Sequence, residues 1–371
     1  MKNLDELYNQ IKFCTIFTTG RTGSDYLQGC LDNVPGVLTF SGPIFYYNFC
    51  DTNHLNSFEK ENLAKNLDLF IQNNSHLLVK NDVENKILNI DIEKFKESFF
   101  KISEKKSLTR QKFLLALYLS YHISLGRDIN NINIMVHHSH HINETKRFLD
   151  DFKNPKLLIT IRDPRANLKS GIVNWINYDQ KRENQHHFYL YIKRIREDLK
   201  FALAQNNEKF FVKLEEADNI ELKNKLSDFL EIKFDQNIMR STYAGKNWKG
   251  DRVSQFTSSE GEGEYKKSVQ DNKWQNFFSS KDKLVLEHIY KDYRIFGYKI
   301  NKVNLINKIF IFFLIPLPFV FDKKVFSLKY YFNKNTSFKN KFCEIFFYLK
   351  RIVYLYMLLF KIRYGKNTWQ C

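Results

Sequence analysis

The sequence predicts an α/β protein in which helices flank a doubly wound parallel sheet, followed by a basic, hydrophobic helical extension at the C-terminal end. Three observations support this fold class. Short apolar segments alternate with helical patterns through residues 12–300, which is typical of parallel sheets. The 371 residues are 43% hydrophobic, which is sufficient for a large core. Residues 301–371 hold 13 Lys and Arg against two acids, a net of +11 within a total of +17.

The first predicted βα unit is the most informative stretch of the chain. Residues 13–19 form an apolar strand, a turn contains Gly20 and Gly23, and a helix begins at Ser24 and ends before Pro35. Free backbone N–H groups and the positive end of the helix would surround an anion there. A Walker A loop would have Lys directly before Ser24, and this chain has Gly, which argues against an ATPase.

The remaining elements are predicted from periodicity and turn residues. In chain order they are a polar lead-in or short helix over 3–12, helices within 52–130, strands over 132–136 and 157–161, a mainly helical stretch over 186–235 with a strand at 209–213, a loop over 245–265, and a helix over 280–298. The second strand leads into HHSHH at 137–141, and the third ends at Arg162, after which Asp163 caps a helix that begins at Pro164. Because ligands bind at the carboxyl edge of such sheets, these segments predict the site.

Cysteine usage and the N-terminal residues predict a cytoplasmic protein. The five cysteines show no CxxC or Cys/His spacing, so neither a disulfide framework nor a zinc site is indicated: Cys14, Cys30, Cys50, Cys343 and Cys371. Residues 1–12 are polar, and the apolar run after them is too short for a signal peptide.

Two motifs together resemble the cofactor signatures of sulfotransferases that use 3′-phosphoadenosine 5′-phosphosulfate (PAPS). They are TTGRTGSDYL at 18–27 and ITIRDPRANLKSG at 159–171. The resemblance covers roughly residues 12–300 and implies a P-loop-type domain over 1–300 with a helical acceptor-side insertion at about 52–130. The segments NWKG at 247–250 and 274–298 look like the closing segment of many bacterial and carbohydrate-directed members.

The resemblance also implies the cofactor-binding residues. The first motif would hold the 5′-phosphosulfate through Arg21, Thr22, Gly23, Ser24 and Asp25, with Arg21 in place of the usual Lys and Asp25 in place of the more usual Thr. The second would direct Arg162 and, eight residues later, Ser170 at the 3′-phosphate. Independently of the family, sulfuryl transfer moves charge onto the leaving phosphate, so a cation such as Arg21 stabilises the transition state.

A histidine is the predicted general base, because its ordinary pKa lies near neutrality. His140 lies 22 residues before Arg162, in a His-Ser-His segment that resembles the family's Lys-Ser/Thr-His. If the strand extends that far, His138 and His140 share one face, and His138 is the alternative base. His138 also occupies the position where the family commonly has a catalytic Lys.

Each of these residues also has a plain structural interpretation, which the sequence leaves open. The glycines could serve the geometry of the turn only, Arg162 could form a salt bridge, and Ser170 could be an ordinary helix residue. His140 could be structural. The HHSHH segment could bind a metal, although sulfuryl transfer needs none. Further residues are interpreted as solvated charges or packing anchors: Arg165, Lys169, Trp248, Trp274, and the pair Lys266 and Lys267, which stands where the family often brings basic residues to the 3′-phosphate.

The C-terminal extension, residues 301–371, contains two apolar runs, at 309–321 and 352–360, both too short to span a bilayer. With their flanking Lys and Arg they suit an anchor on an anionic membrane surface over residues 303–364. A helical subdomain packed on the core or on a homodimer partner is the equal alternative. No reader motif supports nucleic-acid binding.

We therefore predict a PAPS-dependent sulfotransferase that transfers the sulfuryl group to a hydroxyl without a metal or a covalent intermediate, in the cytoplasm or on the inner face of the membrane. The resemblance favours a carbohydrate or glycolipid acceptor. The alternatives are a P-loop phosphotransferase or kinase that requires Mg²⁺, and a non-enzymatic basic membrane-peripheral protein.

Overall fold

The computed structural model describes residues 3–18, 20–81, 87–178, 187–247, 265, 273–328, 332 and 338–361. Two compact units make up the chain. The sheet unit comprises Met1–Ile161 and Phe201–Gln270, and the helical unit comprises Arg162–Lys200 and Asp271–Cys371. The predicted residues Trp248, Lys249, Gly250, Lys266 and Lys267 lie outside the described residues. The division into domains 1–300 and 301–371 stays a prediction.

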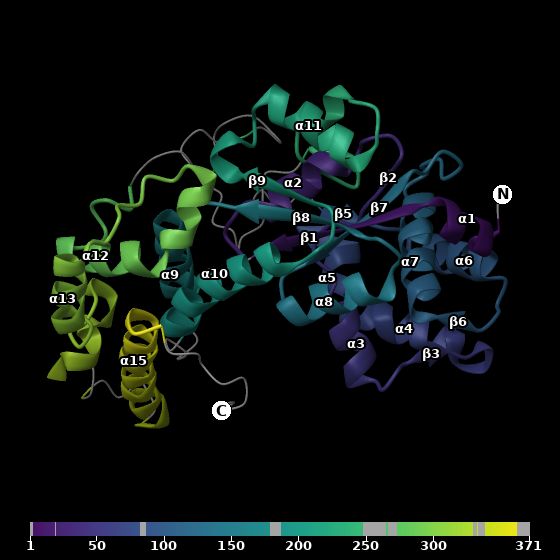
Figure 1. Cartoon of the computed structure of the whole chain (residues 1–371). Helices are drawn as coiled ribbons and strands as arrows, with labels where there is room; N and C mark the ends of the chain where they lie inside the picture. Colours follow the sequence, from purple (N-terminus) through teal and green to yellow (C-terminus); the bar gives the residue numbers. More distant parts are fainter. Residues whose placement is uncertain are drawn as a thin grey trace. The chain divides into compact units, whose positions relative to one another are not determined.

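A five-stranded, fully parallel sheet forms the centre of the sheet unit, which confirms the predicted α/β class (Figure 1). Its strand order is β2-β7-β1-β8-β9. The strands are β1 Lys12–Thr18, β2 Val37–Leu38, β7 Ile134–Ser139, β8 Lys156–Ile161 and β9 Lys209–Lys213. Since β1 lies between β7 and β8, the turn after β1 opens at the middle of the carboxyl edge, where doubly wound sheets bind ligands.

Both faces of the sheet are covered by helices, as the near-continuous apolar strands require (Figure 1). Cys14 and Ile16 of β1 pack with α2 (Ser24–Leu31) and α11 (Ile220–Leu230). Phe13, which points to the other face, lies 4.3 Å between ring centroids from Phe152, just after α8 (Ile142–Asp151). The alternation of side chains along each strand thus fixes which helix lies on which face.

The helices predicted within residues 52–130 are present, with short antiparallel strand pairs between them. They begin after α3 (Tyr46–Thr52) and are α4 Leu63–Asn73, α5 Ser75–Leu78, α6 Ile92–Ser103 and α7 Arg110–Ser124; the strand pairs are β3 Ser57–Phe58 with β6 Leu108–Thr109 and β4 Val79–Asn81 with β5 Ile87–Asn89. Aromatic stacking fixes α7, because the Phe113 and Phe58 rings lie parallel with centroids 3.6 Å apart. The polar lead-in forms α1 (Leu4–Gln10), which is held by a capping box between Asn3 and Glu6.

The helical unit begins with α9 (Pro164–Tyr178) and most of α10 (His187–Ala204) and continues with α12 (Ser280–Ile289), α13 (Leu305–Leu314) and α15 (Phe338–Leu359). The tyrosines that follow α12 hold it to α10, because the Tyr293 hydroxyl donates to the Ile195 carbonyl at 3.0 Å. At 22 residues, α15 is much longer than the apolar run of 352–360 that the sequence singles out. None of the helices in the described ranges combines the length and the apolar character that a bilayer span requires.

The strand that differs most from its predicted bounds is β7. The strand predicted over 132–136 is β7, Ile134–Ser139, so it includes two histidines. His137 and His138 pair in register with Thr15 and Ile16 of β1, and both are fully buried. Backbone pairing with β1 therefore outweighs the polar character of this segment.

Candidate active site

The turn between β1 and α2, which we call the anion loop after its predicted role, has a left-handed backbone at three of its residues. Gly20 and Gly23 have φ angles of +80° and +81°, and Arg21 between them has φ +57°. A residue with a side chain seldom adopts this left-handed region, and such residues are concentrated at functional sites. The first-turn N–H groups of α2 have no acceptor within the helix, so they and the positive end of the helix would favour an anion there.

The Thr22 hydroxyl ties this loop to the sheet. It lies 2.7 Å from the Thr160 hydroxyl on β8 and also bonds the Thr18 hydroxyl at the end of β1. Because Thr22 is only 2% exposed, its hydroxyl is committed to these internal bonds. Its backbone N–H is the group that remains for an anion.

Helix α2 is anchored at its far end by a buried carboxylate. Asp32 accepts hydrogen bonds from the Thr242 hydroxyl at 2.9 Å and the Gly245 N–H at 2.8 Å, and it pairs with Arg127 at 3.2 Å. These bonds fix the helix, and with it Asp25 in the first turn, whose carboxylate is 57% exposed.

His138 lies on β7, and His140 follows the last residue of that strand, Ser139, so the strand does not extend as far as the predicted alternation required; the two rings nevertheless lie together. Their Nε2 atoms are 3.1 Å apart, and the His138 Nδ1 atom is 2.8 Å from Oε1 of Gln28 on α2. The Asp25 Oδ1 atom lies 3.7 Å from His138 Nδ1 and 4.0 Å from His140 Nε2. The structure thus brings together the histidine pair and the first turn of the helix that follows the anion loop.

The accessibility of the two histidines distinguishes them. The side chain of His138 is fully buried, whereas that of His140 is 24% exposed. A general base must reach the proton of a bound acceptor. This difference in exposure favours His140 as the base, with His138 buried next to it on the side away from solvent.

His137 points to the opposite face of β7 and has a structural environment. Its ring is stacked on Phe148 at 5.1 Å between centroids, and its Nδ1 atom is 3.0 Å from the Tyr118 hydroxyl. Burial lowers the pKa of His137 to about 3, so this ring stays neutral near pH 7.

The second motif contributes residues to the helical unit. Arg162 directly follows the last residue of β8, and α9 begins at Pro164 as predicted, with the Asp163 carboxylate accepting from the Arg165 N–H at 2.9 Å. The expectation that Arg165 is a solvated charge is wrong. This side chain is buried, pairs with Asp163 at 2.7 Å and lies 4.0 Å over the ring of Trp274, which is the anchor that the sequence suggests.

Two cations of the helical unit act electrostatically on a third, Lys169. Burial, followed by the positive charges of Lys273 and Arg162, lowers the pKa of Lys169. Positive charges that disfavour the protonated form of Lys169 would favour an anion beside it. Ser170, half-buried on α9, neighbours Lys169 in the chain, so the second motif carries a hydroxyl next to a lysine whose pKa is lowered.

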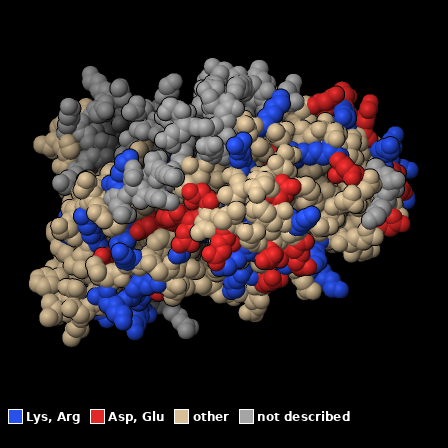
Figure 2. Space-filling view, turned by 90° about the horizontal axis from the view of Figure 1, so that it is seen from above, with Lys and Arg blue, Asp and Glu red and all other residues tan. Residues whose placement is uncertain are grey.

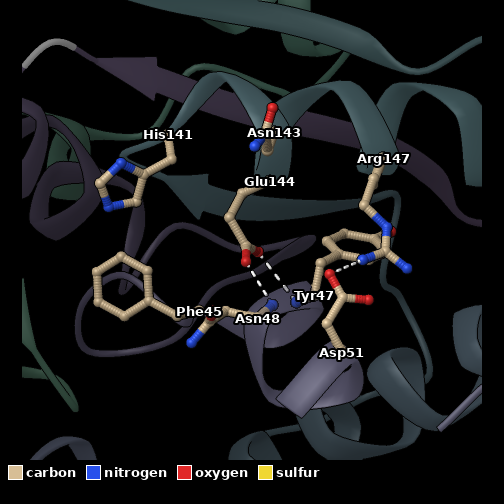
Figure 3. A pocket seen from close by; sticks show the side chains of 8 residues that line it. All are labelled: Phe45, Tyr47, Asn48, Asp51, His141, Asn143, Glu144 and Arg147. Carbon is tan, nitrogen blue, oxygen red and sulfur yellow. Dashed lines mark hydrogen bonds and ion pairs between the residues drawn. The ribbon is translucent and has the colours of Figure 1, made fainter. Parts of the chain in front are cut away.

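A cavity of about 420 Å³ opens beside the histidines, between α3 and α8 (Figure 3). The Glu144 carboxylate at its floor accepts from the N–H groups of Tyr47 at 3.0 Å and Asn48 at 2.6 Å, and burial raises the pKa of Glu144. Polar side chains and one exposed aromatic ring dominate the wall: Phe45, Tyr47, Asn48, Asp51, His141, Asn143, Glu144 and Arg147. The Phe45 ring lies 6.3 Å between centroids from His140, so the cavity adjoins the candidate base.

A metal-binding interpretation of the histidine segment also has a geometric basis. Among the described residues, Asp25, His138 and His140 bring one donor atom each to within 4.8 Å of one another. Imidazole nitrogen with carboxylate oxygen suits a divalent transition metal. This donor set differs from the HHSHH cluster itself, because His137 and His141 point elsewhere.

Sequence reasoning missed Gln28 and the cavity residues Phe45 and Glu144. A signal for Gln28 is present, because it is a polar residue on the core-facing side of α2, between Leu27 and Cys30. Glu144 lies in the first turn of α8, but its partners on α3 are 96 and 97 residues away in the chain. Only the folded chain brings these groups together.

Neither the family models nor the curated proteins contain a match to this chain. Solved structures do resemble it. The sulfotransferase domain of the Synechococcus PCC 7002 olefin synthase is similar with a TM-score of 0.48 and 14% identity, over 81% of this chain and 98% of that one. The sulfotransferase domain from the curacin biosynthetic pathway is similar with a TM-score of 0.46 and 14% identity, over 78% of this chain and 99% of that domain. A retinol dehydratase in complex with androsterone and the inactive cofactor PAP is similar with a TM-score of 0.35 and 14% identity, over 81% of this chain and 86% of that one.

Proposed function

We propose that this protein is a PAPS-dependent sulfotransferase that acts on a hydroxyl. In the reaction, His140 takes the proton of the acceptor hydroxyl, and the acceptor oxygen attacks the sulfur of PAPS in line. The bond between that sulfur and the 5′-phosphate oxygen breaks, and its electron pair leaves on the adenosine 3′,5′-bisphosphate (PAP). Arg21 and the N–H groups of residues 22–25 stabilise the charge that develops on the leaving phosphate.

The observation that carries this proposal is the position of the histidine pair beside the anion loop. Both histidines lie within 4.0 Å of Asp25, in the first turn of the helix that this loop starts. A base next to an anion-binding loop is the minimum arrangement for transferring an anionic group to a deprotonated nucleophile.

The residues of the loop and of the second motif favour PAPS over ATP. Gly23 precedes Ser24, where a Walker A loop has Lys. The cations Arg162, Lys169 and Lys273 supply a second phosphate site within the helical unit, and PAPS differs from ATP by its 3′-phosphate. Arg162 and Ser170 are therefore assigned to the 3′-phosphate.

Calorimetric titration with PAP, 5′-AMP and ATP, with and without Mg²⁺, tests the cofactor. We expect metal-independent binding of PAP that is far tighter than that of 5′-AMP. Arg162→Ala should weaken PAP binding by about 100-fold, since hydrogen bonds to charged groups contribute about 1.5–3 kcal/mol. Lys225→Ala, an exposed lysine on α11, is the control and should bind as the wild type does.

The outcomes separate the alternatives. Stronger binding of ATP with Mg²⁺ would replace the sulfotransferase with a phosphotransferase. Absence of nucleotide binding, together with membrane binding that survives Arg21→Ala and Arg162→Ala combined, would identify a non-enzymatic membrane protein.

The cavity beside His140 supports a carbohydrate or the sugar portion of a glycolipid as the acceptor. Asn48 and Asn143 offer amides, and Asp51 and Arg147 form an ion pair at the rim (Figure 3). Phe45 is 37% exposed, and an aromatic ring can stack on the apolar face of a sugar. A cavity of this volume suits a ligand of sugar size.

Transfer of labelled sulfate from PAPS to a panel of p-nitrophenyl glycosides, with a sterol and free p-nitrophenol as competitors, tests the acceptor class. We expect transfer to the glycosides. Phe45→Ala should raise the KM for the glycoside about tenfold and leave PAP affinity unchanged, and Phe45→Tyr should restore it. Preferred transfer to the sterol would exclude the carbohydrate assignment.

An apolar surface of the helical unit supports association with a membrane. Tyr354 and Leu355, on one side of α15, are buried. The opposite side exposes an apolar stripe at the helical spacing, which Phe360 continues just after the helix: Phe342, Ile345, Leu349, Val353 and Phe360. Most of the large side chains of α13 are also exposed, including Leu305, Ile306, Ile309, Phe310 and Phe313. A monomer that leaves so large an apolar surface uncovered usually binds something there.

The charge of this segment indicates an anionic bilayer as the occupant. Only two acids stand in residues 301–371, and neither adds exposed negative charge: Glu344 is buried, and Asp322 pairs with Arg351 at 3.3 Å. Lys302, shortly before α13, and Lys308, within it, are exposed. Figure 2 shows Lys and Arg side chains beside uncharged surface on the face that it draws. These features support the proposal that the protein associates with an anionic membrane surface, such as the inner face of the cell membrane, through basic and apolar side chains acting together.

Flotation with lipid vesicles tests this association. We expect flotation with vesicles of about 30% anionic lipid and weak flotation with neutral ones. Replacing Phe310 and Phe313 by Asp should abolish it, whereas Ile220→Asp, an exposed apolar residue of α11, should not. A stable dimer by light scattering without flotation would assign the surface to a second copy of the chain instead.

A further inference from the structure

A hydrogen-bond chain connects the interior of the sheet unit to the candidate base. It runs from Gln28 on α2 through His138 on β7 to His140, with donor–acceptor distances of 2.8 and 3.1 Å. The groups around Gln28 determine which atom is the donor in each of these hydrogen bonds. That direction determines which nitrogen of His140 can accept a proton.

The orientation of the Gln28 amide follows from its neighbours. Its nitrogen lies 2.8 Å from the Phe40 carbonyl and 3.2 Å from the Gly42 carbonyl. Carbonyl oxygens only accept hydrogen bonds, so the atom facing them must be the NH₂ group. The Gln28 Oε1 atom is therefore the one that faces His138, and it can only accept.

Two tautomers follow from this acceptor. The His138 Nδ1 atom must carry a hydrogen to bond Gln28 Oε1, so the Nε2 atom of the neutral ring has the lone pair. The His140 Nε2 atom then carries the hydrogen of the bond between the two rings. In His140 the lone pair accordingly resides on Nδ1.

We infer that Nδ1 of His140 is the atom that takes the acceptor proton, and that Gln28 and His138 are positioning residues that hold His140 in this tautomer. This inference deepens the proposed sulfotransferase function and rests on it. The arrangement parallels the orienter–base logic of hydrolase triads, with a neutral imidazole and an amide in place of one carboxylate.

The same chain stabilises the charge that the base acquires. When Nδ1 of His140 receives the proton, the ring becomes an imidazolium, and its Nε2–H bond to His138 becomes charge-assisted. The Asp25 carboxylate, 4.0 Å from His140 Nε2, faces this positive charge. Asp25 thus has an electrostatic role toward the base, besides its place in the anion loop.

Histidine tautomers are measured directly by nuclear magnetic resonance of ¹⁵N-histidine-labelled protein. We expect His138 to have a protonated Nδ1 and an unprotonated Nε2, which is the rarer tautomer in water, and His140 to have the opposite pattern. Gln28→Met removes the acceptor at similar side-chain length and should return His138 to a mixture of tautomers. Gln10→Met, on the exposed side of α1, is the matched control.

Kinetics then test the positioning role. His138→Phe should lower kcat about 10- to 100-fold while the Kd for PAP changes less than about twofold, because the base loses its orienter and the cofactor site is intact. His138→Gln should restore part of kcat, since its carbonyl can accept from His140 Nε2–H.

These readouts separate this inference from the proposed function. A protonated Nε2 on His138, or a His138→Phe variant with wild-type kcat, would overturn the relay even in an active sulfotransferase. If the protein binds no PAP, the proposed function fails, but the tautomers of His138 and His140 can still be measured by nuclear magnetic resonance.

Discussion

Substitution of Gly23 by Ala tests whether the anion loop needs glycine at its junction with α2. Gly23 has φ +81°, and a Cβ atom there would lie 2.2 Å from Leu214 Cδ1. The left-handed backbone costs a residue with a side chain about 1–2 kcal/mol. Crowding of a buried leucine adds about 1–3 kcal/mol. We therefore expect Gly23→Ala to lower the free energy of unfolding by about 2–5 kcal/mol, a large share of the roughly 5–15 kcal/mol typical of domains.

Gly20→Ala is the matched control, because Gly20 has φ +80° but nothing lies within 4 Å of its added Cβ. Only the backbone term, about 1–2 kcal/mol, should apply there. Urea titration of both variants, followed by PAP calorimetry, measures the difference. In a double-mutant cycle, Leu214→Ala should remove the crowding term from Gly23→Ala. Equal losses for the two glycine variants would refute the steric argument.

Two further predictions concern protons and metals. His122 and His137 are buried, which lowers the pKa of each to about 3, so near pH 6.5 the unfolded chain binds protons at these rings and the native state does not. The free energy of unfolding should therefore fall as the pH falls, by about 2 kcal/mol per histidine between pH 7 and pH 5. Urea titrations at a series of pH values measure this, and a free energy of unfolding that stays constant over this range would contradict the prediction. Because Asp25, His138 and His140 can present donors to one ion, Zn²⁺ should inhibit turnover and EDTA should leave it unchanged, with Asp25→Asn less sensitive to Zn²⁺; loss of activity in EDTA would instead indicate a required metal.

The elements that the sequence predicts best are those whose signals are local. The strand at 209–213 matches β9, and α9 starts at Pro164, because an apolar run or an Asp-Pro cap acts within a few residues. The loop glycines and the alternation of His138 and His140 belong to the same class of evidence. Each depends on backbone geometry that neighbouring residues determine.

The features that pattern reasoning misses depend on distant partners. Because histidine is polar, periodicity does not predict that the two histidines of β7 are buried in a strand. Phe148 contacts His137 on one face of the sheet, and Gln28 contacts His138 on the other. Arg165 looks like a surface charge until Trp274 packs against it. The apolar run at 352–360 covers only the C-terminal part of α15, which begins at Phe338, so the run underestimates the length of the helix.

Asp25 illustrates how one carboxylate has two opposed effects. In the first turn of α2 it is favourable to the helix dipole but repels a phosphate bound at the loop. Its Oδ1 atom also lies 4.0 Å from His140 Nε2, where it stabilises an imidazolium by about 1 kcal/mol at the water-like dielectric expected for a carboxylate that is 57% exposed. Asp25→Asn should therefore bind PAP more tightly and turn over about fivefold more slowly. A variant with weaker PAP binding, or with unchanged kcat, would show that Asp25 does not oppose the cofactor and assist the base in this way.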